Sequence, residues 1–388
     1  MCGIAGVISL GENLRPEDRS DAEQMLSALR HRGPDGAALL ESPRAVVGNT
    51  RLRVTDLSAA ADLPMTSEDG SLWLAYNGAV TDFRELRRRL QARGRPLRTA
   101  SDAEVVLRLY EERGIAMLDE LTGMFAFCIV DRRRRKAYLA RDFYGQRPLF
   151  HHQRNGRLYF ASEIKSFLEL PGFDKSLDVE GLYHFFSLAY VPGRRTPFSS
   201  VRELPGGCLL EIDLDTGKLS EREYYRLRYE ADESLTEDQA AARVRDLMLD
   251  SVRRSVDVDV PVGLALSGGV DSGGLLALLK ELGLARKVHT FSLRMDSPSF
   301  DESDYQRRLV EFARPIHHEV TVKAADVERN LLRHMAYLDE PSGDGAAIPF
   351  FLLAEQAGEH VRVMLSGEGG DEVFNAYETH RAYRAREL

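Results

Sequence analysis

Turn residues divide the first half of the chain into short apolar runs. The run at 3–8 predicts a buried strand, and the stretch 21–30 predicts a helix. The runs at 125–130 and 136–140 predict paired strands joined by a basic turn, and 208–214 predicts a last hairpin. We therefore expect several strands in this half.

Strands and helices alternate in the second half. A capping box, Thr236 with Gln239 three residues on, begins a helix whose apolar residues recur with a 3.6-residue period. Strands are expected at 260–266, 288–293, 316–322 and 361–365, with helices at 273–282 and 301–313. This order predicts a parallel sheet with helices on both faces, whose ligands bind beyond the carboxyl ends of the strands.

Length and composition fit two ordinary globular domains. The 388 residues suffice for two cores, and contents of 43% hydrophobic and 29% charged residues are typical of such domains. Acidic residues exceed basic ones, 61 to 52, and the resulting net charge of −9 argues against a nucleic-acid partner. The acidic stretch 229–233 is expected to belong to a linker.

Cysteine content and hydropathy indicate in which cellular compartment the protein is expected. Cys2, Cys128 and Cys208 are too few for a disulfide framework, so we expect a reducing environment. No apolar run approaches the roughly 18 residues that a membrane-spanning helix needs. The amino terminus also lacks the charged-then-apolar layout of a signal peptide. We expect a cytoplasmic protein with no membrane partner.

The stretch 266–272, Leu-Ser-Gly-Gly-Val-Asp-Ser, carries the strongest chemical signal. A glycine-rich turn between strand and helix aims backbone N–H groups, a serine hydroxyl and a helix N-terminus at one point, which is an anion site. It is not a Walker loop, because no Lys-Ser or Lys-Thr closes it. Asp271 would repel a bound phosphate unless a hard cation such as Mg²⁺ bridged the two. The run resembles the pyrophosphate loop of ATP pyrophosphatases, which split ATP into AMP and pyrophosphate while activating a substrate.

A second glycine-rich loop, 366–372, follows the last expected strand. Its three carboxylates repel one another, so they are either solvated or face a cation. On a strand parallel to the first loop, a shared Mg²⁺–triphosphate site is the favoured interpretation. Asp339 and Glu340, directly before Pro341, add two further carboxylates at an expected break in secondary structure.

Cys2 follows the initiator methionine, and its small side chain permits removal of Met1. A terminal Cys2 would carry a thiol beside a free α-amino group, whose ordinary pKa near 8 suits a general base. A Met-Cys start alone would mean little, but further motifs follow. They are at 31–36, 51–56, 74–78, 101–104, 141–150 and 160–165, with Ser101 or Asp102 expected to cap a helix at 105–113.

Other conspicuous residues have structural interpretations. The basic run 132–135 is expected to be a solvated hairpin tip rather than a nucleic-acid patch. Adjacent side chains on a strand point to opposite faces, so the pairs 151–152 and 317–318 are interpreted as structural histidines rather than metal ligands. Cys128 and Cys208 are expected to be small buried hydrophobes.

Together, the motifs of the first half resemble the glutaminase domain of the class II glutamine amidotransferases, over about residues 2–210. The resemblance implies an α+β N-terminal-nucleophile hydrolase fold, with stacked antiparallel sheets between helices. It implies that Cys2 attacks the side-chain amide of glutamine. Asn77 and the Gly78 N–H would form the oxyanion hole, where fixed dipoles face developing negative charge.

The same resemblance implies a glutamine pocket. Arg51 would hold the substrate α-carboxylate through a bidentate fork, and Asp102 would hold its α-ammonium group. The other implied pocket residues are Leu52, Val54 and Ala79. Relatives usually have Asn-Gly-Glu-Ile-Tyr-Asn where this chain has Asn-Gly-Ala-Val-Thr-Asp at 77–82, so only the oxyanion donors are kept.

The second half resembles the synthetase domain of the glutamine-hydrolysing asparagine synthetases, expected at 236–388 after a linker at 211–235. The resemblance implies an α/β domain of the ATP-pyrophosphatase type that uses ATP and Mg²⁺. It implies Asp271 and Asp371 as metal ligands and Glu368 near the reacting carboxylate. The residues implied to bind pyrophosphate are Ser267, Gly268, Gly269 and Ser272, and those implied to contact the nucleotide are Leu266, Leu293, Ser366 and Gly367.

Two departures stand out in this half. Gly370 replaces a Ser or Ala of the family, which we expect to have a small effect. The family's synthetase domain continues well past the point where this chain ends, with a catalytic lysine and much of the acceptor pocket. Either this sequence is a shortened form of a longer protein, or its acceptor site is incomplete.

The combined resemblance implies glutamine-dependent, ATP-driven amidation of a carboxylate through an acyl-adenylate. Its partners would be glutamine and a carboxylate acceptor, aspartate first, in a homodimer. Three alternatives stay open. They are the same chemistry on a sugar acid, peptide or natural-product carboxylate, a glutaminase or regulatory protein with a shortened inactive synthetase half, and a nucleic-acid-modifying ATP pyrophosphatase.

Overall fold

The computed structural model describes residues 1–296 and 301–377. Its contacts divide the chain into two compact units. The amino-terminal unit comprises Met1–Glu230 and Leu338–Gly343, and the carboxy-terminal unit comprises Ala231–Tyr337 and Asp344–Leu388. A six-residue segment thus belongs to the first unit although the chain on either side of it belongs to the second.

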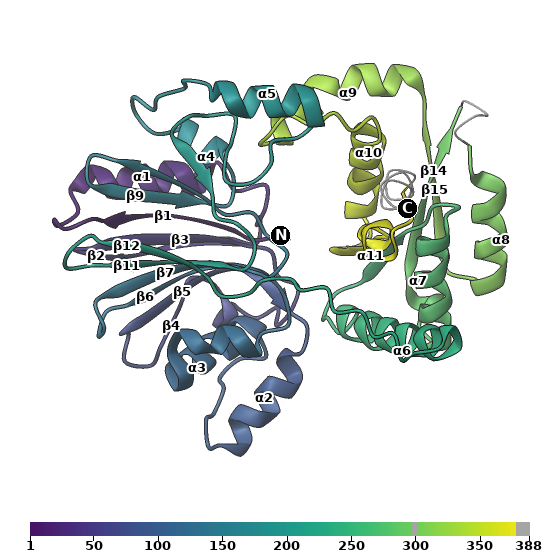
Figure 1. Ribbon diagram of the computed structural model, residues 1–388, viewed down its shortest axis with the longest axis horizontal. Coiled ribbons are helices and arrows are strands. Elements are labelled where there is room, and N and C mark those ends of the chain that lie inside the picture. Colours follow the sequence, from purple (N-terminus) through teal and green to yellow (C-terminus); the bar gives the residue numbers. More distant parts are fainter. Residues whose placement is uncertain (297–300, 378–388) are drawn as a thin grey trace. The chain divides into compact units, whose positions relative to one another are not determined.

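Two stacked six-stranded antiparallel sheets form the amino-terminal unit, as predicted (Figure 1). In sheet order, the first contains β10 (Val201–Glu203), β8 (Phe150–Arg154), β9 (Arg157–Ala161), β1 (Gly3–Ser9), β3 (Ala45–Arg51) and β2 (Gly36–Ser42). The second contains β12 (Leu219–Glu223), β11 (Cys208–Asp213), β7 (Lys136–Arg141), β6 (Gly123–Asp131), β5 (Leu72–Val80) and β4 (Met65–Thr66).

Helices cover the outer face of each sheet. Helices α1 (Pro16–Ser27) and α4 (Lys165–Leu168) pack on the first sheet, α3 (Asp102–Arg113) packs on the second, and α2 (Phe83–Ala92) packs on α3. The remaining elements are helix α5 (Val179–Leu188) and the 3₁₀ turns η1 (Ala59–Ala61) and η2 (Gly114–Glu120).

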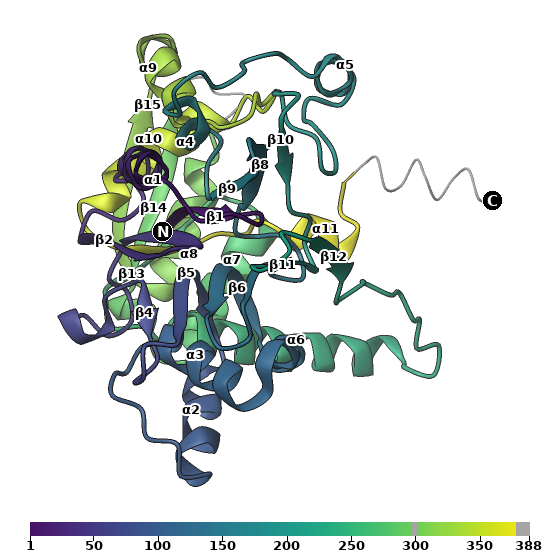
Figure 2. The same cartoon turned by 90° about the vertical axis from the view of Figure 1, so that its left-hand side faces the viewer.

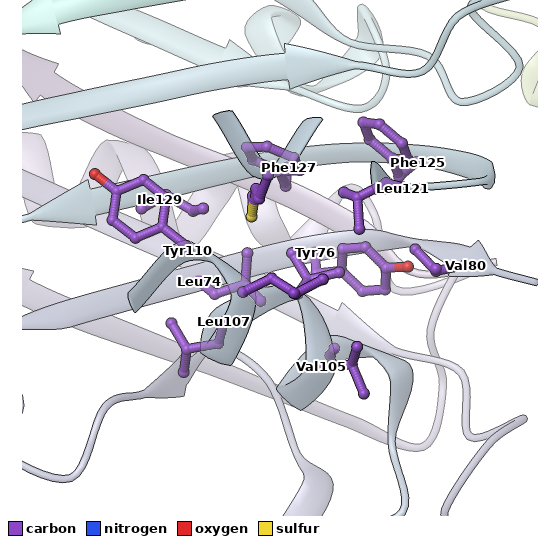
Figure 3. Packing of buried hydrophobic residues seen from close by; sticks show 14 of the residues in the cluster. Leu74, Tyr76, Val80, Val105, Leu107, Tyr110, Leu121, Phe125, Phe127 and Ile129 are labelled. Atoms are coloured by element: carbon purple, nitrogen blue, oxygen red, sulfur yellow. The ribbon is translucent and has the colours of Figure 1, made fainter. Parts of the chain in front are cut away.

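Strand alternation places the side chains of β5 in two cores. Leu74, Tyr76 and Val80 face α3, where Val105 and Leu107 pack on them (Figure 3). The intervening positions, including Trp73 and Ala75, join the core between the sheets. Asn77 lies two residues after Ala75 and so points to the same face. Its side chain is directed toward the core between the sheets, which contains residues of β1.

The carboxy-terminal unit is a parallel sheet with helices on both faces, as predicted. In sheet order its strands are β15 (Ile316–Val322), β14 (His289–Met295), β13 (Val262–Ala265) and β16 (Val363–Leu365). One face packs on α6 (Glu237–Ser255), α7 (Val270–Glu281) and α8 (Ser303–Ala313). The other packs on α10 (Ala347–Gly358), beside α9 (Ala324–Tyr337); η3 (Ala285–Lys287) and α11 (Gly370–Phe374) complete the unit (Figure 2).

Several elements differ from their expected bounds. Helix α7 begins at Val270, three residues before its expected start, and therefore includes Asp271 in its first turn. The range 211–235, expected to be a linker, contains the end of β11 and all of β12, because β11 pairs with β7 on one side and β12 on the other. None of the helices in the described part of the chain combines the length and apolar character that crossing a bilayer requires.

Candidate active sites

Cys2 lies directly before β1, with its thiol against the loop after β3. The Cys2 Sγ accepts a hydrogen bond from the Leu52 N–H at 3.4 Å, and the thiol donates to the Leu52 carbonyl at 3.8 Å. Burial raises the pKa of the Cys2 thiol, although the hydrogen bond with Leu52 and the nearby α-amino group oppose that shift. Burial also lowers the pKa of the Met1 α-amino group to about 6. The lowered pKa favours the neutral form of the Met1 amine, the form in which an amine can accept a proton.

Strand β4 pairs with β5 only at Trp73 and Leu74. Beyond this pairing, the edge of β5 that faces away from β6 presents backbone N–H groups at alternate residues. Gly78 lies opposite Phe125 of β6. The Phe125 N–H donates to the Asp142 carboxylate, and the Phe125 carbonyl accepts the Asp142 N–H, so Gly78 and Phe125 do not exchange hydrogen bonds and the Gly78 N–H points away from β6. On the same edge, the N–H of Tyr76 is bonded to Asn49 and that of Val80 to Asp102. The Gly78 N–H between them also faces away from β6, as the predicted oxyanion-hole donor would have to.

Asn77 supplies a second donor. Its side chain is only 1% exposed, and its Nδ2 has no hydrogen-bond partner among the residues that the structure describes. An unpartnered buried amide costs stability, so such a group is retained where a ligand completes it. Gly78 beside it must be glycine, because a Cβ there would lie 2.6 Å from the Tyr76 hydroxyl oxygen.

Replacing Asn77 by Ala tests this donor. We expect the kcat for glutamine hydrolysis to fall by about 10²- to 10³-fold, the usual cost of removing one oxyanion-hole donor. Ammonium-dependent amide synthesis should be unchanged and serves as the internal control for folding. Glutamine hydrolysis at the wild-type rate would exclude Asn77 from the oxyanion hole.

Asp102 is the first residue of α3 and is buried. The structure settles the capping alternatives, because the Ser101 side chain accepts the Ala103 N–H and is the N-cap. One oxygen of Asp102 accepts the Tyr76 hydroxyl at 2.7 Å and the Val80 N–H at 3.1 Å. Burial raises the pKa of Asp102, and these hydrogen bonds partly offset the effect. The carboxylate is close enough to Cys2 to raise the thiol pKa as well.

A pH profile with Tyr76→Phe tests the role of Asp102. The carboxylate must be ionised to hold an ammonium group, so kcat/KM for glutamine should fall as pH drops through the raised pKa of Asp102. Loss of the Tyr76 hydrogen bond destabilises the charged form and should move this acidic limb up by about one pH unit. Tyr110→Phe is the matched control, because the Tyr110 hydroxyl contacts Asp131 at 3.0 Å instead. An acidic limb at the same pH in both variants would contradict the assignment.

Arg51 is engaged within its own loop. Its guanidinium donates to the Asp62 carboxylate at 2.5 Å and to the carbonyls of Ser58 at 2.9 Å and Asp56 at 2.5 Å. A substrate carboxylate held by both Nη groups would have to replace partners of this kind. Leu52 and Val54 lie in the same loop, and Ala79 is half-buried on β5, so the expected pocket residues fall on two segments.

Arg32 and Glu163 also hold the backbone of Cys2 in place. Both lie in motifs noted in the sequence, but no role was predicted for either. The Arg32 Nε donates to the Cys2 carbonyl at 2.9 Å, and its Nη1 donates to Glu163 at 2.6 Å. Burial alone would raise the pKa of Glu163, but hydrogen bonds from His31, Arg32 and Lys165 outweigh it and lower the pKa to about 2. Glu163 therefore stays ionised and fixes the arginine that holds the Cys2 backbone.

The segment 338–343 is joined to this network. Asp339 accepts the Ile164 N–H at 2.8 Å and lies 3.5 Å from the Lys165 Nζ, which also contacts Glu163 at 2.9 Å. Burial and the charge of Glu163 raise the pKa of Asp339 to about 6. Burial raises the pKa of Glu340 to about 7. The two carboxylates predicted at a chain break thus belong to the amino-terminal unit.

The nucleotide loop is shaped by its own serines. The Ser272 hydroxyl is buried, lies 2.8 Å from the Ser267 hydroxyl and accepts the Ser267 N–H at 3.2 Å. The Gly268 N–H donates to the Glu302 carboxylate at 2.8 Å. A carboxylate therefore holds one of the donors expected for pyrophosphate, and a phosphate oxygen would have to displace it. Gly269 is the N-cap of α7, so orphan N–H groups of the first helical turn face the same space.

The two glycine-rich loops meet at Asp271. A Cβ on Gly367 would lie 3.0 Å from the Asp271 Cβ, and one on Gly370 would lie 2.6 Å from the Asp271 Cγ. A Ser or Ala at 370 would therefore require the Asp271 carboxylate to move, a closer coupling than we expected. In the part of the chain that the structure describes, neither Asp271 nor Asp371 has a hydrogen-bond or ion-pair partner for its carboxylate. Free carboxylate oxygens on adjoining loops suit a hard cation such as Mg²⁺.

The remaining predicted residues lie at the same carboxyl edge of the sheet. Leu266 is buried and follows β13, with its carbonyl accepting the Ser292 hydroxyl at 2.7 Å. Leu293 lies near the end of β14, and its carbonyl accepts the Gln306 amide at 3.2 Å. Ser366 is half-buried and Glu368 is exposed, both directly after β16.

Comparisons with known proteins match both halves of the chain to families. Residues 1–225 match the family model of the glutamine amidotransferase domain, and residues 243–388 match that of asparagine synthase. The chain is similar to asparagine synthetase 1 of Bacillus subtilis, with 32% identity covering 98% of this chain and 60% of the relative. It is also similar to asparagine synthetase B of Escherichia coli, with 30% identity covering 100% and 67%.

A solved glutamine phosphoribosylpyrophosphate amidotransferase from B. subtilis is a more distant neighbour. Its TM-score is 0.44 at 17% identity, covering 73% of this chain and 64% of that one.

The stacked sheets and the family match place residues 1–225 in the class of glutamine amidotransferase domains. The chain as a whole belongs to the family of the glutamine-hydrolysing asparagine synthetases. It spans 60% of the length of the B. subtilis relative.

Proposed function

We propose that this protein makes an amide from a carboxylate, using ammonia released from glutamine and activation by ATP. Aspartate is the proposed acceptor and asparagine the product, as in the names of the relatives. The observation that carries the proposal is the presence of two different sites in one chain. One contains the Cys2 thiol and the buried Asn77 amide, and the other is a glycine-rich loop with Asp271 and Asp371, whose carboxylates have no partner among the described residues.

At the first site, Cys2 attacks the side-chain amide carbon of glutamine after Met1 is removed. The amino group then released on Cys2 takes the thiol proton and passes it to the departing nitrogen. Asn77 Nδ2 and Gly78 N–H stabilise the tetrahedral oxyanion. Ammonia leaves, a thioester remains, and water hydrolyses it to glutamate and free thiol. Asp102 binds the substrate α-ammonium, and Arg51 binds its α-carboxylate after exchanging a loop partner.

At the second site, the loop Ser267–Ser272 binds the phosphates of ATP at the N-terminus of α7. Asp271 and Asp371 would hold Mg²⁺, which offsets the repulsion between these carboxylates and the phosphates. The acceptor carboxylate attacks the α-phosphorus, pyrophosphate leaves, and an acyl-adenylate forms. Ammonia then attacks the acyl carbon and AMP departs. Glu368 lies near this reacting carbon.

Cellular setting and assembly follow from the same proposal. Three cysteines in 388 residues are too few for a disulfide framework, which supports a reducing cytoplasm. We propose a homodimer that binds neither nucleic acid nor membrane. Light scattering of the purified protein measures its oligomeric state directly.

Product analysis tests the proposed acceptor. With glutamine, ATP, Mg²⁺ and aspartate, we expect equal amounts of asparagine, AMP and pyrophosphate. A panel of sugar acids and peptides in place of aspartate should yield no amide. Amide formation from another carboxylate alone would replace the acceptor but keep the chemistry. Glutamine hydrolysis without pyrophosphate exchange into ATP for any acceptor would identify a glutaminase with an inactive second half.

A further inference from the structure

Three histidines meet at the edge of the parallel sheet opposite the nucleotide loop. His289 is the first residue of β14, His318 lies on β15, and His360 lies between α10 and β16. The His289 Nδ1 and the His318 Nε2 are 2.9 Å apart. One ring nitrogen from each of the three lies within 4.8 Å of the others. Three elements therefore place imidazole nitrogens around one point.

Sheet register explains this meeting. Phe291 on β14 pairs with His318 on β15, so His289 and His318 emerge on the same face, which α10 covers. Helix α10 ends at Gly358, and the ring of His360, two residues later, lies beside those of His289 and His318. The rings stack, with the centroid of His318 4.3 Å from that of His360 and 5.2 Å from that of His289. His317 points to the other face and contacts the Thr290 hydroxyl at 2.9 Å, so the two adjacent histidines do not share one site, but His318 joins a cluster that was not foreseen from the sequence.

The donor set selects a class of cation. Neutral imidazole suits Zn²⁺, Cu²⁺ and Ni²⁺, whereas Mg²⁺ and Ca²⁺ prefer oxygen. Tetrahedral Zn²⁺ with bonds of about 2.0–2.1 Å places its ligand nitrogens about 3.3 Å apart. The spacing of His289 and His318 is already near this value. His360 is exposed, so its side chain can turn to bring the third nitrogen closer.

We propose that His289, His318 and His360 bind one divalent transition-metal ion, Zn²⁺ first, with solvent in the fourth position. The ion would link the segment between α10 and β16 to strands β14 and β15. This segment leads into β16 and the second nucleotide loop, so the ion would stabilise the carboxy-terminal unit without entering the reaction. The site is independent of the proposed amidation, because its ligands lie at the amino ends of the strands, away from Asp271.

Calorimetry with metal-free protein carrying no affinity tag tests the site. Titration with ZnCl₂ should show one equivalent bound per chain, and Zn²⁺ should raise the melting temperature of the wild type more than that of His360→Ala. His360→Ala is the first variant, because this residue is exposed and its loss should not impair folding. We expect Zn²⁺ affinity to fall at least tenfold in His360→Ala and in His318→Ala. His317→Ala is the matched control and should bind as the wild type does.

A Cys2→Ala background separates this binding from capture by the amino-terminal thiol. Co²⁺ in place of Zn²⁺ should give visible absorption typical of nitrogen ligation in the wild type and lose it in His360→Ala. Equal Zn²⁺ affinity in wild type and His360→Ala, or no bound equivalent in the wild type, would overturn the proposal and leave a hydrogen-bonded histidine stack only. Both outcomes are independent of whether amide synthesis is observed.

Discussion

Replacing Cys2 by Ala should abolish glutamine-dependent amide synthesis and leave ammonium-dependent synthesis intact. Without the thiol there is no thioester, so glutamine hydrolysis should fall by about 10⁴-fold or more. Added ammonium bypasses the first site, because the second site needs only a neutral ammonia molecule and an activated carboxylate. Alanine is also small enough at this position to permit removal of Met1, so the variant differs from the processed wild type at one side chain.

Initial rates with saturating glutamine and with ammonium chloride, each followed by asparagine release, give the comparison. Cys128→Ala is the control, because Cys128 is buried in β6 and has no role in the proposed chemistry. Intact mass of the wild type should show the loss of Met1. Equal loss of both activities in Cys2→Ala would mean that the residue supports folding rather than glutamine hydrolysis.

Replacing Asp271 by Asn should have the complementary effect. The side chain keeps its size but loses the charge that would hold Mg²⁺ beside the phosphates. We expect pyrophosphate exchange into ATP to fall by about 10²- to 10³-fold, or roughly 3–4 kcal/mol. Glutamine hydrolysis at Cys2 should stay at the wild-type rate, since it does not use the nucleotide loop.

Isotope exchange between labelled pyrophosphate and ATP, measured with aspartate over a range of Mg²⁺ concentrations, gives the result. Asp246→Asn is the matched control, because the Asp246 side chain is 76% exposed on α6 and contacts its neighbour Arg245. Wild-type exchange in Asp271→Asn would remove this carboxylate from the nucleotide site.

Local patterns were sufficient to predict much of the carboxy-terminal unit. The bounds of β15 are those expected, and the capping box of Thr236 and Gln239 begins α6. In both cases the signal lies within a few neighbouring residues. Helices α9 and α10 were not predicted, although α10 packs apolar residues on the parallel sheet and α9 packs on α10.

Contacts between distant residues were beyond the sequence patterns. The bond from Arg32 to the Cys2 carbonyl, the clamp of Asn49 on Tyr76 and the pairing of Arg51 with Asp62 depend on how strands and loops close. The same holds for the assignment of 338–343 to the amino-terminal unit. The identities of the donors in both sites could be proposed from motifs. Their partners could not, because buried polar groups are satisfied by whatever the fold brings beside them.

Transfer of nitrogen from the first site to the second is the central claim, and isotope labelling tests it most directly. The wild-type protein would be supplied with glutamine carrying ¹⁵N in its side-chain amide, together with ATP, Mg²⁺, aspartate and an excess of unlabelled ammonium. Mass spectrometry of the asparagine should show ¹⁵N in the new amide well above the fraction expected from mixing with the free ammonium. Asparagine carrying only the unlabelled nitrogen would contradict the account, because the glutamine nitrogen would then not reach the activated carboxylate before mixing with solvent.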